Sequence, residues 1–234
     1  MKNIQDYILS TFKDSDLSPS KSTISSKYHL RFELGDNLKN GTKKRVNQSV
    51  LRAVTIFEEF FKPDDEIWIL IKSYKHKNSA VKEFWRPTTG YLESQFTGYE
   101  LINKICFKET IEEFDEALNA ETNLMELMDF TCTHIQNFFN LKVSDISYKN
   151  IIEGIANLEM GFNPSIGENI YFINPRNHVA FHMYDDRGCL LFSGNRETLK
   201  PTYIKFNQWL VDYHRPTFDE IFLERVATDH DKKN

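Results

Sequence analysis

The chain has 234 residues, of which 40% are hydrophobic and 14% aromatic, and its formal net charge is -5 at pH 7. Proteins whose main task is to bind nucleic acid rely on clustered Lys and Arg to neutralise phosphates, so this acidic balance disfavours nucleic acid as the primary ligand. We interpret two basic runs as solvated faces: the clearer one, Lys39, Lys43, Lys44 and Arg45, and a second around Lys72, Lys75, His76 and Lys77.

Cysteine usage and the first residues of the chain bear on its compartment. Cys106, Cys132 and Cys189 are odd in number and widely spaced, which fits neither a disulfide framework nor a zinc site. The first residues lack the apolar core of a signal peptide, and nowhere do about 18 apolar residues run together, as a membrane span requires. We therefore expect a cytoplasmic protein without a membrane partner.

The N-terminal part predicts a helix, a strand, a second helix and a second strand. Apolar residues at helical spacing indicate a short helix at residues 4–12, and the serine-rich segment 15–26 is expected to form a mobile loop. Alternation from Tyr28 to Leu34 is typical of a half-buried strand, and one broad apolar stripe predicts a helix at residues 44–61. The next strand, residues 66–71, is apolar on both faces and should be central in a sheet.

The middle of the chain is less regular, whereas the C-terminal part has clear signals. We expect short helices at Tyr99 to Phe107 and Ile111 to Leu118, then a strand at residues 127–135. The remaining predicted elements are a helix at residues 148–158, an antiparallel meander of strands at 169–173, 178–184 and 189–192, and a closing helix at 198–213.

These elements predict the fold class. Residues 1–234 should form a single α+β domain with a mostly antiparallel sheet and helices packed chiefly on one face. The C-terminal subregion 148–225 contains the densest pattern.

The turn between the last two meander strands contains the most suggestive polar residues. Asp185 and Asp186, with His182 upstream on the strand, could act as metal ligands, and Arg187 could steady a phosphate. Alternatively, the carboxylates bond the amides of their own turn, Gly188 supplies a positive φ and Arg187 pairs with a nearby carboxylate. A third possibility is that Asp185, Asp186 and Arg187 belong to a protein-binding surface.

Two other groups of residues suggest binding or chemistry. Trp85, Arg86 and Tyr91 are of the types that anchor partner proteins, although large side chains in a long loop can equally form a satellite core. Cys132 and His134 share one face of a predicted strand, where a nucleophile and base are conceivable but core packing is the commoner role.

The C-terminal third also carries a family resemblance. The segment YFINPRNHVAFHMYDDRGCLLF and the following KFNQWLVDYHR resemble the bacterial domain of unknown function 3885 family, with Tyr184 to Cys189 and Asn207 to Tyr213 carrying most of the likeness. The segments LRFELG and RAVTIFEEFFKPDDEIW look like the front half of longer members. The resemblance implies no reaction, but small acidic bacterial proteins of this kind often accompany toxins as immunity proteins.

We therefore expect a non-enzymatic, cytoplasmic factor that binds another protein, with an immunity or antitoxin-like role against a toxin as the specific hypothesis. No cofactor or metal is predicted for this function. The alternative is a metal-assisted hydrolase or nuclease that uses Asp185, Asp186 and His182.

Overall fold

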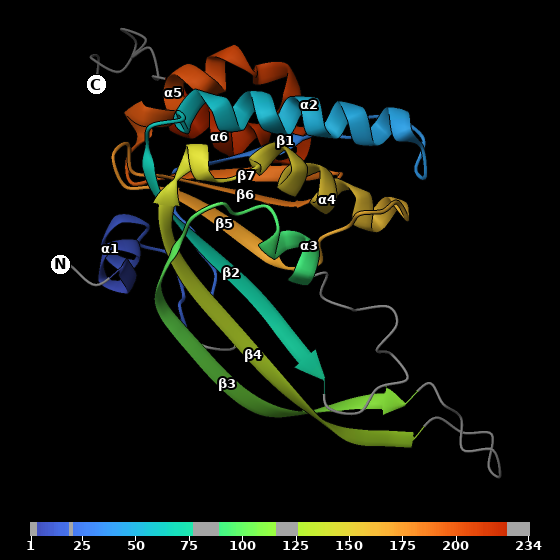
Figure 1. The fold of residues 1–234 in the computed structure, drawn as a ribbon. Helices are drawn as coiled ribbons and strands as arrows, with labels where there is room; N and C mark the ends of the chain where they lie inside the picture. Colours follow the sequence, from blue (N-terminus) through green and yellow to red (C-terminus); the bar gives the residue numbers. More distant parts are fainter. Residues whose placement is uncertain (1–3, 19–20, 77–88, 116–125, 224–234) are drawn as a thin grey trace, which may run out of the picture.

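The computed structural model describes residues 4–18, 21–76, 89–115 and 126–223, of which 74–76, 89, 107, 109–115 and 126–132 are described by their backbone alone. Its centre is a seven-stranded sheet in the order β1-β7-β6-β5-β2-β4-β3, in which all neighbouring strands are antiparallel (Figure 1). This confirms the predicted α+β class and the mostly antiparallel sheet. No helix in the described ranges is long and apolar enough to cross a membrane.

The sheet and its helices are formed by the following segments. The strands are β1 (His29–Glu33), β2 (Glu66–His76), β3 (Glu100–Asp115), β4 (Glu126–Lys142), β5 (Asn169–Asn174), β6 (Val179–Asp185) and β7 (Gly188–Ser193). The α-helices are α1 (Ile4–Thr11), α2 (Lys43–Phe60), α3 (Thr89–Glu93), α4 (Tyr148–Met160), α5 (Arg196–Lys205) and α6 (Arg215–Phe222).

The C-terminal meander forms as predicted and lies between the two N-terminal strands. Strands β5, β6 and β7 pair in sequence order, β7 continues to β1, and β5 pairs with β2. The unit β1-α2-β2 therefore joins two strands that run in the same direction but are separated by three others. Strand β2 is central, as its apolar sequence predicts.

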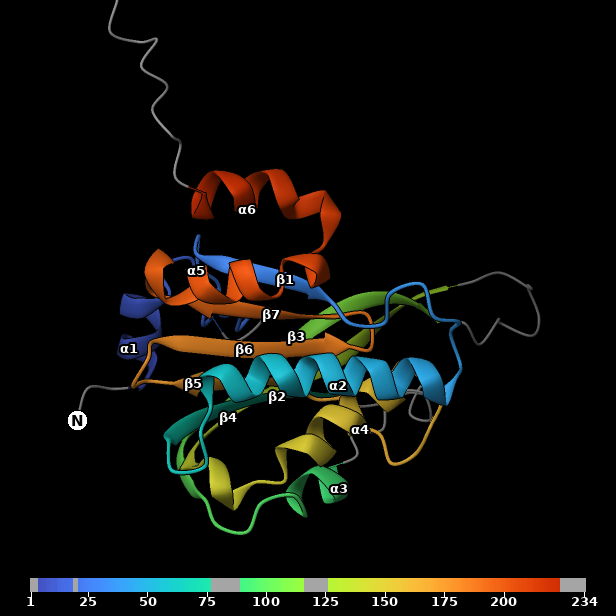
Figure 2. The same ribbon diagram turned by 90° about the horizontal axis from the view of Figure 1, so that it is seen from above.

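The two faces of the sheet are covered unequally. Helices α2, α4 and α5 lie over one face, and α6 lies beyond β1 at the edge of the sheet (Figure 2). All four contribute to the large cluster that includes Phe57, Ile152 and Phe181. The other face carries α1 and a smaller cluster that includes Ile8 and Phe12. This arrangement confirms that the helices pack chiefly on one face.

The prediction of two short helices in the middle of the chain is wrong. Residues 100–115 form the single strand β3, which pairs along its length with β4 in a hairpin that extends past the body of the sheet (Figure 1). The pairing with β4 overrides the weak local pattern, because strand propensity depends on the neighbouring strand more than on the sequence itself.

The closing helix is also shorter than predicted. Helix α5 begins after Asn195, whose Oδ1 accepts a hydrogen bond from the Thr198 amide at 3.0 Å, and it ends at Lys205. The chain then turns back so that the Val211 amide donates to the Arg31 carbonyl at 3.0 Å. The apolar stripe continues through residue 210, but these residues cover the free edge of β1 instead of extending the helix.

The serine-rich segment 15–26 contributes two apolar side chains to the smaller cluster. Leu17 and Ile24 are buried, and the Ser26 Oγ donates to the Ser193 carbonyl at 2.8 Å. Its mobility, like the single-domain assignment, stays a prediction.

Candidate functional site

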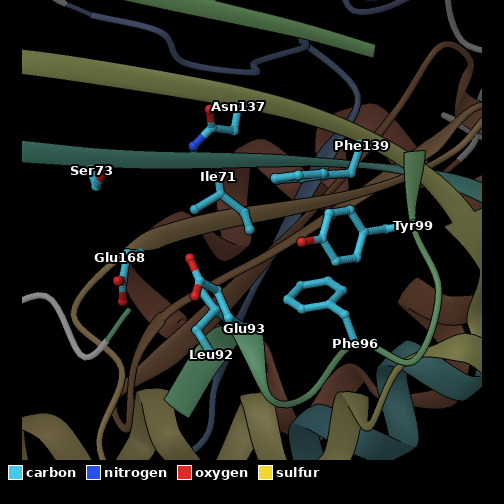
Figure 3. A pocket seen from close by; sticks show the side chains of 9 residues that line it. All are labelled: Ile71, Ser73, Leu92, Glu93, Phe96, Tyr99, Asn137, Phe139 and Glu168. Carbon is cyan, nitrogen blue, oxygen red and sulfur yellow. The ribbon is translucent and has the colours of Figure 1, made fainter. Parts of the chain in front are cut away.

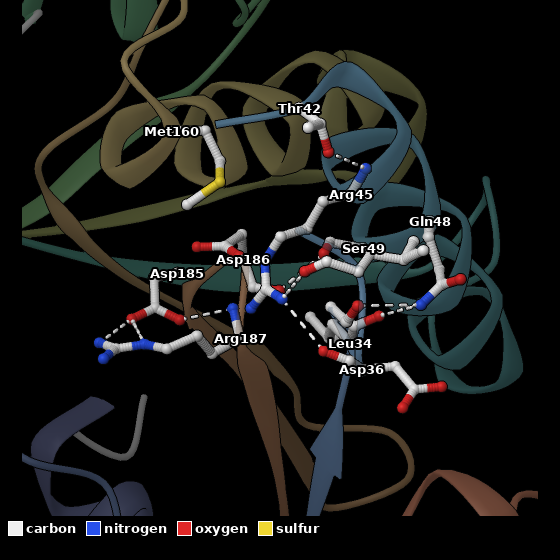
Figure 4. Close-up of polar contacts among 12 residues, drawn as sticks. Leu34, Asp36, Thr42, Arg45, Gln48, Ser49, Met160, Asp185, Asp186 and Arg187 are labelled. Atoms are coloured by element: carbon white, nitrogen blue, oxygen red, sulfur yellow. Dashed lines mark hydrogen bonds and ion pairs between the residues drawn. The ribbon is translucent and has the colours of Figure 1, made fainter. Parts of the chain in front are cut away.

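The two aspartates of the β6–β7 turn point to different partners (Figure 4). Asp185 accepts bonds from its own turn: the Arg187 amide lies 2.7 Å from Oδ1, and the Arg187 Nε lies 2.7 Å from Oδ2. The guanidinium of Arg187 is otherwise largely exposed to solvent. Asp185 and Arg187 therefore stabilise the turn, as the structural alternative predicted.

Asp186 points instead into the interior, towards α2. Its Oδ2 forms an ion pair with the Arg45 Nε, and both side chains are buried. Arg45 also donates through Nη1 to the carbonyls of Asp36 at 3.1 Å and Leu38 at 2.7 Å, while the Ser49 Oγ donates to the Asp186 carbonyl at 2.6 Å. We call Arg45, Ser49 and Asp186 the clasp, because they join the meander to α2 and to the loop before it.

Two interpretations made from the sequence around this turn are wrong. Arg45 belongs to the basic run 39–45 but is not a solvated residue of that run. Gly188 does not have a positive φ, since the positive values among the described glycines are at Gly41 and Gly161. A Cβ at Gly188 would instead lie 2.7 Å from the Phe32 carbonyl and would overlap the Tyr184 hydroxyl, so the residue is small because β1 approaches it closely.

The two histidines near the turn lie apart from its carboxylates. His178 is exposed at the start of β6 with φ 56°, where its Nδ1 lies 2.8 Å from the Tyr7 hydroxyl. His182 is buried on the sheet face opposite the clasp, with its Nδ1 2.9 Å from the Ile170 carbonyl and its ring stacked on Tyr171. Burial lowers the pKa of His182 to about 4, so its ring is neutral at pH 7. Among the described residues, no group of three or more His, Cys, Asp or Glu side chains could hold a metal ion.

An open groove of about 610 Å³ runs along the sheet face that His182 shares. Its polar lining centres on Arg31, whose Nε donates to the Tyr184 hydroxyl at 3.1 Å and whose Nη1 lies 3.4 Å from the His214 Nε2. Burial, and then the nearby Arg31, lower the pKa of His214. This groove offers hydrogen-bond donors and one fixed positive charge, and residues far apart in the sequence build it.

The predicted aromatic anchors are only partly described. Trp85 and Arg86 lie outside the described residues. Tyr91 is half-buried in α3 against the large cluster, not in a separate satellite core, and its role as an anchor stays a prediction. The side chain of Cys132 is likewise outside the described part, so the nucleophile hypothesis for Cys132 and His134 stays untested.

The face next to Tyr91 contains a concave site that the sequence did not reveal. A small cavity lies between α3, the ends of β2 and β4, and the residues that lead into β3 (Figure 3). Its lining combines carboxylates with apolar and aromatic groups: Ile71, Ser73, Leu92, Glu93, Phe96, Tyr99, Asn137, Phe139 and Glu168. These residues come from four separate segments, 71–73, 92–99, 137–139 and 168, so no local motif could have indicated the site.

The start of β3 next to this cavity exposes apolar side chains. Tyr99, Leu101 and Ile102 are 56%, 49% and 44% exposed. The register of β3 against β4 shifts between Leu101 and Asn103, and such a bulge turns side chains away from the regular alternation. The cavity and these three residues together form one surface, which we call the β3 face.

Comparison with known proteins agrees with the resemblance seen in the C-terminal third. A curated relative, the uncharacterized protein YnaE of Bacillus subtilis (strain 168), is 24% identical over 225 residues, which cover 90% of this chain and 98% of the relative. No solved structure matches the chain. The family model described as "Domain of unknown function (DUF3885)" matches residues 4–214, and the chain therefore belongs to the DUF3885 family.

Proposed function

We propose that this protein is a non-enzymatic, cytoplasmic factor that binds another protein through its β3 face. The observation that carries the proposal is an edge strand with exposed apolar residues, Leu101 and Ile102, and no described strand on its outer side. Free edges of this kind pair readily with other chains, so proteins normally protect them. An unprotected apolar edge is a common docking place for an extended segment of a partner.

The opposite edge of the sheet, strand β1, is protected from pairing with another chain. The outer side of β1 is covered by the chain itself, through the Val211 amide on the Arg31 carbonyl and a bridge between Phe32 and Leu210. Farther along β3, the exposed Lys104 and Lys108 disfavour pairing with another strand, because charged side chains oppose edge-to-edge association. The apolar part is thus confined to the segment beside the cavity.

The alternative function, a metal-assisted hydrolase, requires carboxylates and a histidine that converge on one open site. Asp186 is held by Arg45 on the helix-covered face, Asp185 by its own turn, and His182 lies on the other face. This separation favours the binding function over the hydrolase.

The specific hypothesis is an immunity or antitoxin-like role. Its support is the acidic character of the chain, because complementary charge speeds the encounter with a basic toxin and orients it. The carboxylates of Glu93 and Glu168 on the β3 face add local negative charge where the partner would dock.

Site-specific photo-crosslinking tests the binding function. A photoreactive phenylalanine analogue at Tyr99 should crosslink a discrete protein in the host, whereas the same analogue at the exposed Tyr213 should not. With the purified partner, Leu101→Lys should weaken binding by about tenfold or more. Leu51→Lys, on the exposed side of α2, is the matched control.

Two results would contradict the proposal: crosslinks that are the same from both positions, or partner binding that Leu101→Lys leaves unchanged. The immunity role has its own test. Co-expression with a toxin gene from the same locus should protect cells in the wild type, and protection should be lost in the Leu101→Lys variant.

A further inference from the structure

The most unusual polar group on the β3 face is the carboxylate of Glu168. The residue lies just before β5 and is only 6% exposed. Neither Oε1 nor Oε2 has a hydrogen-bond partner among the described residues. Carboxylates are almost never fully buried unless they are paired, and no side chain in the described part of the chain pairs with this one.

The cavity shows where such a partner would lie. Figure 3 shows the carboxylates of Glu168 and Glu93 on one side of the cavity and the rings of Phe96 and Tyr99 on the other. The Tyr99 ring meets Phe139 edge to face at 5.3 Å, so the aromatic wall is continuous. The cavity volume of about 80 Å³ suits a few water molecules or the end of one side chain, not a whole nucleotide or sugar.

The electrostatics of the cavity favour a cation. Burial, and to a smaller extent the charge of Glu93, raise the pKa of Glu168, and the nearby backbone amides of Glu168 and Gly167 offset only part of this effect. A positive group would compensate that charge, and the aromatic faces would attract it further. Ammonium and guanidinium groups fit this chemistry, since they are donors with no acceptor atoms.

We infer that the cavity binds the ammonium or guanidinium end of a lysine or arginine side chain that the partner protein supplies. This inference rests on the proposed function and deepens it. Tyr99 lines the cavity and directly precedes β3. A partner segment that pairs with the start of β3 can therefore direct one of its alternating side chains into the cavity.

Small cations test the site without the partner. We would titrate n-butylguanidinium and n-butylammonium into the purified chain and follow the side-chain amide of Asn137, which lines the cavity, by NMR. Saturable shifts are expected with both cations, and none with the neutral isostere N-butylurea. In Glu168→Gln the affinity should fall by about tenfold or more, because a charge-assisted bond is lost. Glu220→Gln, an exposed change on α6, should behave like the wild type.

Equal affinity in the wild type and Glu168→Gln, or no saturable binding of either cation, would overturn the inference. The variant also has a prediction of its own: without ligand, Glu168→Gln should melt at the same temperature as the wild type or higher, because burial disfavours the charged carboxylate and the glutamine oxygen can still accept bonds from the nearby backbone amides. A lower melting temperature would assign Glu168 to the structure of the protein and reject the site. Glu93→Gln, an exposed change, provides a second variant, and it should weaken cation binding less than Glu168→Gln does.

A peptide distinguishes a cation that comes from a partner protein from a free amine. It also tests the partner-binding function separately from the cation site. An extended Val-Arg-Val peptide should bind more tightly than butylguanidinium and lose affinity in Leu101→Lys as well as in Glu168→Gln. The citrulline analogue should bind weakly to every variant. If the small cations bind but the peptide gains nothing from Leu101, the cavity is a site for free amines and the partner-binding function fails. If the peptide depends on Leu101 but not on Glu168, the edge stands as the docking site and the cation site fails.

Discussion

Removing the charge of Asp186 is the sharpest test of the clasp. Asp186→Asn keeps the shape of the side chain but leaves the buried guanidinium of Arg45 without its counter-ion. Removing one partner of a buried pair typically costs about 3–5 kcal/mol. Arg45 keeps its bonds to two backbone carbonyls, so we expect the lower end, about 3 kcal/mol of the free energy of unfolding.

Asp185→Asn is the matched control one residue away. The partner of Asp185, the Arg187 guanidinium, is largely exposed, and such pairs contribute about 0–1 kcal/mol. The asparagine oxygen can also still accept the bond from the Arg187 amide. The two neighbouring variants should therefore differ in stability by about 2 kcal/mol, with Asp186→Asn the less stable.

Urea unfolding at pH 7, followed by circular dichroism, measures both values. The double variant Arg45→Met/Asp186→Leu completes the comparison, because it removes both charges together and should cost less than the sum of the single variants. If Asp186→Asn were no more destabilising than Asp185→Asn, the pair would not hold the meander on α2. If Asp186→Asn were as stable as the wild type, the Arg45–Asp186 ion pair would have no role in stabilising the fold.

Three further predictions concern buried groups. Burial lowers the pKa of His182 from 6.5 to about 4, so between these pH values the unfolded chain binds a proton that the folded chain does not. The free energy of unfolding should therefore fall by about 3 kcal/mol as the pH is lowered from 6.5 to 4. Urea unfolding across this range should show this decrease in the wild type and not in His182→Gln. In a Cys132→Ser background, a thiol reagent should label the exposed Cys106 rapidly and Cys189 only after unfolding, because burial raises the pKa of the Cys189 thiol; fast labelling of both thiols would contradict the burial. Gly188→Ala should cost about 1–3 kcal/mol through overpacking, although the backbone there suits any residue; an unchanged melting temperature would show that the β1 approach is looser than described.

The C-terminal half of the fold could be predicted because its signals are local. The turn residues around Pro175 and Gly188 lie between short apolar runs, and that pattern alone specifies a meander. The strand β3 could not be predicted in the same way. Its residues gain their conformation from pairing with β4, and no alternation within residues 100–115 indicates which face is buried.

The candidate sites show the same limit more strongly. The motif at Asp185 and Asp186 was visible, but Arg45, the residue that decides its role, lies 141 positions away from Asp186. No sequence pattern indicated Glu168, since its importance comes from a cavity that four separate segments build together. Burial without a partner is a property of the folded chain, and only a structure can reveal it.

The segments that carry the family likeness are used for the fold and not for the β3 face. The turn Tyr184 to Cys189 contains Asp186 of the clasp, and the segment Asn207 to Tyr213 covers the edge of β1. Trp209 lies against the guanidinium of Arg52, 5.3 Å from the ring centroid, and so ties that cover to α2. In this chain, these two segments therefore fix the β6–β7 turn and close one edge of the sheet. The proposal of a protein partner rests on the other edge, where the apolar start of β3 lies beside the cavity that the buried Glu168 lines.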